Sequence, residues 1–174
     1  MGFNKGTISN CHTSSGLVKG SNYGGTGGIV GGNGTIENGG IITGSSNSCD
    51  VEGSSNSMTG GIAGRNGGLI ETCMVTGNIT GHASYTGGLA GANGTCGLYQ
   101  GGFDIFQGII QNCYTQANIT TTKTDYWTWI GGIVGANDNS KVKHCYSAST
   151  LTFDPTLTFV GGLIGSNKLG SNTP

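Results

Sequence analysis

Apolar and polar residues alternate along several short stretches of the chain, each of which follows a cysteine. Counting from the cysteine, the second, fourth and sixth positions are small or apolar, whereas the first and third positions are mostly polar or aromatic. The sixth position holds Leu17, Ile79, Ile119 and Leu151 in four of the stretches. Alternation with a period of two predicts strands with one inward face, so we expect an all-β protein with almost no helix.

A five-residue glycine phrase, such as Gly27-Gly28-Ile29-Val30-Gly31, separates these strands and occurs five times. Its copies occupy residues 27–31, 60–64, 87–91, 131–135 and 161–165. A repeat of this period is typical of solenoids, in which each unit buries its apolar face only against its neighbours. We therefore predict a parallel β-solenoid (β-helix) of about five coils, formed by residues 1–174 as a single repeat domain.

An asparagine stands two residues after each glycine phrase. These five residues are Asn33, Asn66, Asn93, Asn137 and Asn167. Glycine and asparagine both tolerate the left-handed backbone conformation of tight corners. Stacked asparagine amides can also bond along the axis of a solenoid, so we predict a ladder of turn asparagines.

Six cysteines occur in the chain, and five of them fall at corresponding positions of the predicted strands: Cys11, Cys49, Cys73, Cys113 and Cys145. An inward thiol packs as a small apolar group, so we predict a buried cysteine ladder. Disulfides are not expected in it, because stacked parallel residues point their Cβ atoms in the same direction. The chain has neither the Cys-x-x-Cys spacing of zinc sites nor the aspartate of calcium-binding nonapeptides, so we expect no metal site and no cofactor.

The composition argues against charged partners. Charged residues make up 9% of the chain and the net charge is −1, which favours neither nucleic acid nor a charged membrane surface as a partner. No apolar run approaches the roughly 18 residues of a membrane span, and residues 1–5 lack the apolar region of a secretory signal. We therefore expect that the segment was cut from a longer precursor or that its export signal lies outside it.

The acidic residues are scattered. Only Asp50 and Glu52 lie two residues apart on one strand face. Glycoside hydrolysis requires two carboxyl groups that face each other across a cleft, and no such pair is evident. We assign no catalytic residue and expect that the protein is not an enzyme.

Four Asn-x-Thr sequences match the acceptor pattern for N-glycosylation, at Asn33, Asn78, Asn93 and Asn118. Two of these asparagines, Asn33 and Asn93, belong to the predicted ladder. The other two should face outward, so Asn78 and Asn118 are the candidate glycosylation sites.

Aromatic residues gather in the longest interval between glycine phrases. The candidate contact patch consists of Tyr99, Phe103, Phe106, Tyr126, Trp127 and Trp129. Insertions in repeat proteins emerge as surface loops and are often part of a binding face. Two interpretations stay open: the rings pack on each other to cover the insertion, or they form an adhesive or self-association surface.

The glycine phrases with their asparagines read GGIVGGN, GGIAGRN, GGLAGAN, GGIVGAN and GGLIGSN, and most are coupled to an I-x-N-C-like strand. This combination resembles the GLUG repeat of bacterial surface adhesins and of non-catalytic regions of some IgA-specific metallopeptidases. The resemblance extends from about Thr7 to Asn167. It implies an extracellular or cell-surface β-solenoid and carries over no catalytic residue, since the His-Glu-x-x-His helix of such peptidases is absent. The chain departs from the pattern around Cys49 and in a long insertion before the fourth glycine phrase.

Two functions therefore remain open. The first is an extracellular structural or adhesive module, joined head to tail to further copies in filaments or flanked by repeats of a longer chain. A glycan or a host surface is its candidate ligand. The alternative is a polysaccharide-binding or polysaccharide-active β-helix protein, which would require an acid cluster for catalysis.

Overall fold

The computed structural model describes residues 2–34, 40–94, 107–123, 127–156 and 159–168. These residues form 26 strands and contain no helix, and every strand pairing is parallel. The all-β, parallel β-solenoid predicted from the sequence is confirmed. Within the described ranges there is consequently no helix long and apolar enough to cross a membrane.

The strands form five sheets, which we number I to V in the order in which each coil passes through them, starting from β2. Sheet I contains β2 (Thr7–Ser9), β7 (Ile41–Thr43), β12 (Leu69–Glu71), β17 (Ile109–Gln111) and β22 (Lys141–Lys143). Sheet II contains β3 (His12–Thr13), β8 (Ser46–Asn47), β13 (Met74–Val75), β18 (Tyr114–Thr115) and β23 (Tyr146–Ser147). Sheet III contains β4 (Leu17–Lys19), β9 (Asp50–Glu52), β14 (Ile79–Gly81), β19 (Asn118–Thr121) and β24 (Thr150–Thr152).

The remaining two sheets flank the glycine phrase. Sheet IV contains β5 (Gly24–Gly27), β10 (Ser57–Gly60), β15 (Tyr85–Gly87), β20 (Trp129–Gly131) and β25 (Phe159–Gly161). Sheet V contains β1 (Phe3–Asn4), β6 (Val30–Asn33), β11 (Ala63–Asn66), β16 (Ala90–Gly94), β21 (Val134–Asp138) and β26 (Ile164–Lys168). Sheet V thus has six strands where each other sheet has five.

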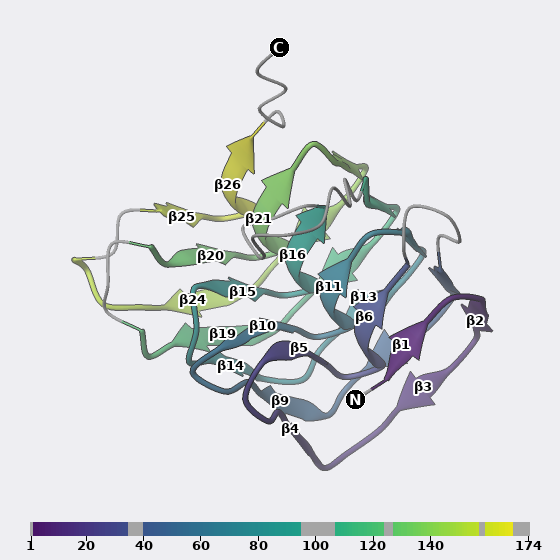
Figure 1. Ribbon diagram of the computed structural model, residues 1–174, viewed down its shortest axis with the longest axis horizontal. Helices are drawn as coiled ribbons and strands as arrows, with labels where there is room; N and C mark the ends of the chain where they lie inside the picture. The colour runs from purple at the N-terminus through teal and green to yellow at the C-terminus, as the bar shows by residue number, and fades with distance from the viewer. Residues whose placement is uncertain (1, 35–39, 95–106, 124–126, 157–158, 169–174) are drawn as a thin grey trace.

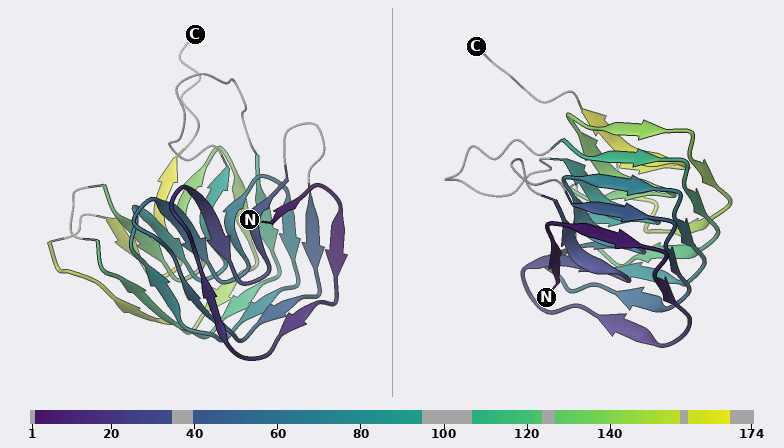
Figure 2. Two further views of the ribbon diagram at one scale, coloured as in Figure 1. Left: turned by 60° about the horizontal axis from the view of Figure 1, so that its bottom comes forward. Right: turned by 90° about the vertical axis from the view of Figure 1, so that its right-hand side faces the viewer.

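One strand from each sheet makes a coil, so the chain forms five coils: β2–β6, β7–β11, β12–β16, β17–β21 and β22–β26. The extra strand, β1, precedes the first coil and pairs with β6. Figure 1 shows the strands of successive coils side by side, from purple β1 to yellow β26, and Figure 2 shows the coils as layers of one stack. The first and last coils therefore lie at opposite ends of the molecule.

The core is one continuous column of apolar side chains. The middle residue of the glycine phrase is fully buried in the inner coils, as Ile62, Leu89 and Ile133. It belongs to the same cluster as the inward residues of sheet I (Ile42, Ile70, Ile110) and sheet III (Val51, Ile79, Ile119). In the first coil the inward residue of sheet III is Val18, which pairs with Val51, and Leu17 is exposed. The predicted inward position of Leu17 was therefore wrong by one residue, because Gly16 adds a left-handed residue (φ +108°) before this strand.

The phrase glycines allow backbones to approach closely. A Cβ atom on Gly60 would lie 2.3 Å from the carbonyl oxygen of Ala63 and 2.6 Å from the Cα of Ala90 in the next coil. A Cβ on Gly61 would lie 2.4 Å from the carbonyl oxygen of Gly88 and 2.5 Å from a methyl group of Val75. Distances this short exclude any side chain, so these positions require glycine for reasons of space.

The left-handed corners lie elsewhere than predicted. None of the described phrase glycines has a φ in the left-handed region. Instead, the residue that follows each strand of sheet I takes a φ between 50° and 59° in every coil, at Asn10, Gly44, Thr72, Asn112 and His144. The asparagine of the I-x-N-C pattern therefore marks the left-handed corner.

A paired glycine substitution tests this account of the phrase. We expect Gly61→Ala to lower the free energy of unfolding by about 2–3 kcal/mol, because the new methyl group overlaps backbone of the next coil. Gly162 occupies the same place in the phrase of the last coil, where a Cβ would meet nothing within 4 Å. Gly162→Ala should change the stability by less than about 0.5 kcal/mol. Urea denaturation measures both, and equal losses would contradict the packing argument.

Candidate functional site

A column of asparagine side chains runs along sheet V through all five coils. Each Nδ2 donates a hydrogen bond to the Oδ1 of the next asparagine toward the C-terminal end. The bonds join Asn4 to Asn33 (2.8 Å), Asn33 to Asn66 (2.8 Å), Asn66 to Asn93 (2.7 Å), Asn93 to Asn137 (2.7 Å) and Asn137 to Asn167 (2.7 Å). The five asparagines after the glycine phrases thus lie in one bonded series, and its inner members are buried.

The first member of this column, Asn4, was not predicted. The sequence carries a signal for it, since Gly2-Phe3-Asn4 repeats the spacing of Gly31-Gly32-Asn33. The same two segments pair in the structure, and the carbonyl oxygen of Gly2 accepts hydrogen bonds from the N–H groups of Gly31 and Gly32. Residues 2–4 therefore form the end of a sixth phrase.

Four cysteines share a column on the inner side of the corner between sheets I and II. They are Cys11, Cys73, Cys113 and Cys145, whereas the second coil has Ser45 at this place. The predicted ladder was therefore wrong at Cys49, which lies four residues further along, opposite Gly77. Ser46 pairs with Met74 and Val51 with Ile79. The left-handed corner at Gly44 determines this register, so Ser45 takes the place in the column although Cys49 is the residue of the same type as the other members.

Burial of the thiols depends on the coil. Cys73 and Cys113 are buried, Cys145 in the last coil is half-buried, and Cys11 in the first coil is exposed; all are free thiols, as is Cys49. A hydrogen bond from the Cys113 thiol stabilises the Cys145 thiolate and lowers the pKa of Cys145 to about 7. The same hydrogen bond, together with burial, raises the pKa of Cys113. The sixth cysteine, Cys96, lies outside the described residues.

The candidate glycosylation sites lie on the outer face of sheet III. The Nδ2 of Asn78 donates to Asp50 Oδ1 (2.9 Å), and the Nδ2 of Asn118 donates to Asn78 Oδ1 (3.0 Å). Both asparagines are exposed, but the nitrogen that would carry a sugar is engaged in a hydrogen bond. Asn33 and Asn93 are buried in the asparagine column. Glycosylation at Asn78 and Asn118 stays a prediction.

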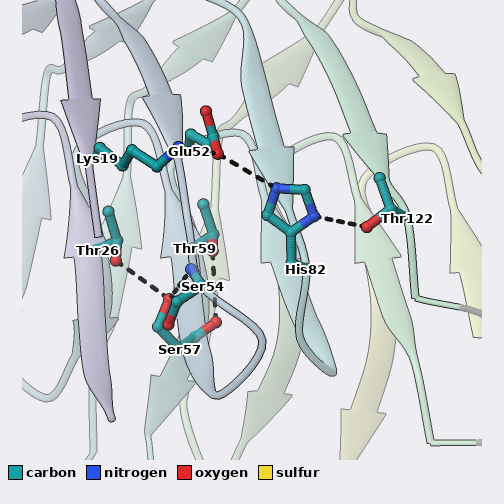
Figure 3. A network of polar contacts seen from close by, with 8 residues as sticks. All are labelled: Lys19, Thr26, Glu52, Ser54, Ser57, Thr59, His82 and Thr122. Atoms are coloured by element: carbon teal, nitrogen blue, oxygen red, sulfur yellow. Dashed lines mark hydrogen bonds and ion pairs between the residues drawn. The ribbon is translucent and has the colours of Figure 1, made fainter. Parts of the chain in front are cut away.

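A second polar row runs over the outer surface beside sheets III and IV (Figure 3). Glu52 Oε1 lies 2.8 Å from Lys19 Nζ and 3.7 Å from His82 Nε2, and His82 Nδ1 lies 2.6 Å from Thr122 Oγ1. The hydrogen bond from Lys19 lowers the pKa of Glu52. Below this row, the Ser57 hydroxyl contacts Thr26 Oγ1 and accepts a hydrogen bond from the N–H of Ser54.

These polar residues form pairs between neighbouring coils. Asp50 is bonded to Asn78, and Glu52 to Lys19, so the two carboxylates have separate partners. Among the described residues, no group of three or more His, Cys, Asp or Glu side chains could hold a metal ion. The row from Lys19 to Thr122 contains the side-chain types of a hydroxyl–imidazole–carboxylate triad. It lies on the outer surface, and of its members Lys19 lines the cavity at the first coil whereas Glu52, His82 and Thr122 do not.

Two members of the candidate aromatic patch, Trp127 and Trp129, are described; Tyr99, Phe103, Phe106 and Tyr126 lie outside the described residues. Trp129 is buried and stacks between Tyr85 (ring centroids 4.9 Å apart) and Phe159 (5.6 Å). Trp127 is 65% exposed, and its ring centroid lies 5.9 Å from that of Trp129. The stack packs on Ala92 and Ala136 of sheet V, so one tryptophan of the patch is part of the packing between sheets IV and V.

The two ends of the coil stack differ from its middle. At the C-terminal end Phe159, Val160 and Leu163 are 40%, 36% and 47% exposed, whereas the residues at their positions in the preceding coil are buried. At the N-terminal end a cavity of about 280 Å³ lies on the free side of the first coil. Its lining includes Gly2, Val18, Tyr23, Gly25, Thr26 and Ile29. The ends are therefore the places where inward-facing columns become accessible.

Comparisons with known proteins agree with this architecture. The GLUG motif matches residues 55–80, which span β10 to β14, so the resemblance to GLUG repeats is confirmed there. A 1.30 Å crystal structure from Bacteroides ovatus, of a protein provisionally described as an immunoglobulin A1 protease, has a similar fold with a TM-score of 0.68 and 23% identity. The match covers 97% of this chain and 51% of that one, so this chain spans about half its length. Among curated protein sequences, none matches this chain.

Removal of one asparagine tests the column. Asn66→Ala removes two buried hydrogen bonds of the column, the one from Asn33 Nδ2 to Asn66 Oδ1 and the one from Asn66 Nδ2 to Asn93 Oδ1, so the free energy of unfolding should fall by about 2–4 kcal/mol. Asn167 ends the column, is exposed and accepts one bond. Asn167→Ala should therefore lower the free energy by no more than about 1 kcal/mol. Chemical denaturation distinguishes the two, and a neutral Asn66→Ala would show that the column adds no stability.

The thiols provide a test by pH. Alkylation of native protein with iodoacetamide, followed by mass spectrometry, should label Cys145 with half-maximal rate near pH 7 and leave Cys113 unlabelled. Since the folded pKa of Cys145 lies below its usual value of 9.0, its ionisation adds stability at high pH that is lost as the pH falls through 7. Cys113→Ala removes the donor and should move the half-maximal rate toward pH 9. An unchanged profile in that variant would contradict the hydrogen bond.

Proposed function

We propose that this protein is an extracellular structural module whose two ends are contact surfaces, and that copies join end to end into filaments. The GLUG motif and the β-solenoid fold support an extracellular module of this type. The end surfaces support the finer part of the proposal.

The observation that carries the proposal is the exposure of core positions in the last coil. Ile133 and Ile130 are fully buried because a further coil lies on them, while Leu163 and Val160, at the same places one coil later, are 47% and 36% exposed. Burial of apolar surface contributes about 25 cal/mol per Å². Association that supplies the next coil is therefore favourable at this end.

The backbone leads to the same expectation. In sheets I to IV, the strands of the first and last coils are edge strands, with one side available for pairing. Edge strands of this kind are templates for pairing with another chain. All strands are parallel, so the first coil of one copy can continue the last coil of another in the direction of the stack. After such a head-to-tail contact each pair of copies still has one free end of each kind. Further copies can therefore add to form a filament, unless the rotation between copies closes a ring.

Support for the enzymatic alternative is weaker. The name of the Bacteroides ovatus protein refers to a protease, but at 23% identity the likeness concerns the fold. The carboxylates of Asp50 and Glu52 are engaged with different partners, and neither faces the cavity. Polysaccharide binding has weaker support as well, because the neighbouring rings of half-buried Tyr114 and exposed Tyr146 on sheet II stack on each other, with centroids 5.3 Å apart.

Sedimentation velocity over a range of protein concentrations tests the proposal. We expect the weight-average sedimentation coefficient to rise with concentration in the micromolar range, and negative-stain electron microscopy to show unbranched rods one solenoid wide. The rods should lengthen with concentration, since a heterologous contact adds copies one by one. A stable monomer up to several hundred micromolar would overturn the proposal.

A further inference from the structure

We infer that the contact between copies continues sheet IV: β25 of one copy pairs with β5 of the next and places Phe159 in the cavity over Gly25. This inference rests on the proposed end-to-end assembly and specifies its register. It identifies the partner surface as the first coil of a second copy of this chain.

The side chains of one sheet IV column supply the first argument. By the strand pairing, the column consists of Gly25, Met58, Tyr85, Trp129 and Phe159 from the first coil to the last. Large side chains occupy every place except the first. At Gly25 a Cβ would lie 2.0 Å from the carbonyl oxygen of Gly31, so only glycine fits there and the backbone is left bare. The column thus has an exposed ring at its C-terminal end and, at its N-terminal end, bare glycine backbone that lines the cavity and on which a ring can pack.

The cavity at the N-terminal end agrees with this arrangement. It has a volume of about 280 Å³, and Gly25 and Tyr23 contribute to its lining. Tyr23 is 74% exposed. A further coil stacked in the register of the other coils would place its own member of the column, Phe159, against Gly25. Buried aromatic rings dominate the energetics of interfaces because they bury 150–250 Å² each.

Two neighbouring columns fit in the same register. By the strand pairing, Val160 is the last member of the column Thr26, Thr59, Thr86 and Ile130. Leu163 is the last member of the column Ile29, Ile62, Leu89 and Ile133. In a stack of copies, Val160 would therefore lie against Thr26 and Leu163 against Ile29, both of which line the cavity. The exposed side chains of Phe159, Val160 and Leu163 at the C-terminal end of one copy would thus contact the lining of the cavity at the N-terminal end of the next.

Sheet V adds a requirement, because β1 already occupies the place beside β6. In the inferred register β26 of the neighbouring copy would take that place, so β1 has to leave. β1 pairs with β6 through only two residues, Phe3 and Asn4. β26 is five residues long and pairs with β21 through four of them. The longer strand can therefore replace the shorter one.

The asparagine column is preserved in this exchange. Asn4 Nδ2 donates to Asn33 Oδ1 at 2.8 Å. Asn167 accepts from Asn137, and no side chain among the described residues accepts a hydrogen bond from its own Nδ2. Asn167 of one copy can therefore donate to Asn33 of the next in place of Asn4. The series of amide hydrogen bonds then continues from copy to copy.

Charged substitutions at the two surfaces test the inference. Phe159→Asp should raise the concentration required for assembly at least ten-fold, because a carboxylate would be buried in the cavity. Tyr23→Asp, on the opposite surface, should also raise the concentration required for assembly, and it replaces Phe159→Asp in the test if that variant does not fold. The matched control is Met74→Asp, at a side chain that is 41% exposed on the outer face of sheet II. It should assemble like the wild type, and circular dichroism should show native β structure in each variant.

Mixing experiments distinguish this register from other contacts. Phe159→Asp retains the N-terminal cavity, so it should bind the C-terminal end of wild-type rods and stop their growth at substoichiometric amounts. Asn4→Ala weakens β1 and should accelerate assembly. If the wild type assembles but Phe159→Asp and Tyr23→Asp assemble equally well, this register is wrong while the proposed function stands. If Asn4→Ala slows assembly or leaves its rate unchanged, β26 does not replace β1. A wild-type monomer at all concentrations overturns both the register and the proposed function.

Discussion

Close approach of backbones at the glycine phrase is the constraint on which the rest of this structure depends. At Gly60, Gly61 and Gly64 the space that a Cβ would need is taken by backbone of the facing sheet or of the neighbouring coil. Because sheets IV and V come this close, the middle residue of the phrase can reach the centre of the core. A chain with only 34% apolar residues thereby fills a core, since in each inner coil the isoleucine or leucine of the phrase packs directly against the inward residues of sheets I and III.

The sequence predicted the fold well because the features that define it are local and repeated. The spacing of the glycine phrases was sufficient to predict the number of coils. The alternation of apolar and polar residues was sufficient to predict which face of most strands points inward. The errors arose where register depends on backbone conformation. Cys49 resembles the other cysteines in type, but the left-handed residue at Gly44 places Ser45 in the column instead. One additional residue at Gly16 likewise brings Val18 inward in place of Leu17.

The candidate surfaces were harder to predict, because they depend on which coil a residue belongs to. Trp129 and Phe159 occupy one column, yet the first is buried and the second is partly exposed. Nothing in the local sequence around Phe159 distinguishes it from an interior residue. Asn4 is the opposite case, because its place in the column follows from the pairing of β1 with β6. In the sequence only Gly2 corresponds to a residue of the glycine phrase, which is too little to identify the position without that pairing.

The stacked coils also have a mechanical consequence. The first and last coils lie at opposite ends of the stack, and neighbouring coils are joined by backbone hydrogen bonds that run along its axis (Figure 2). Tension applied to the two ends would therefore load these bonds in series and open the terminal coil first. Each opened coil of roughly 30 residues would release on the order of 100 Å of extended chain. A rod built in this way would lengthen under load in steps, which single-molecule stretching would record, and would shorten again as its coils re-formed.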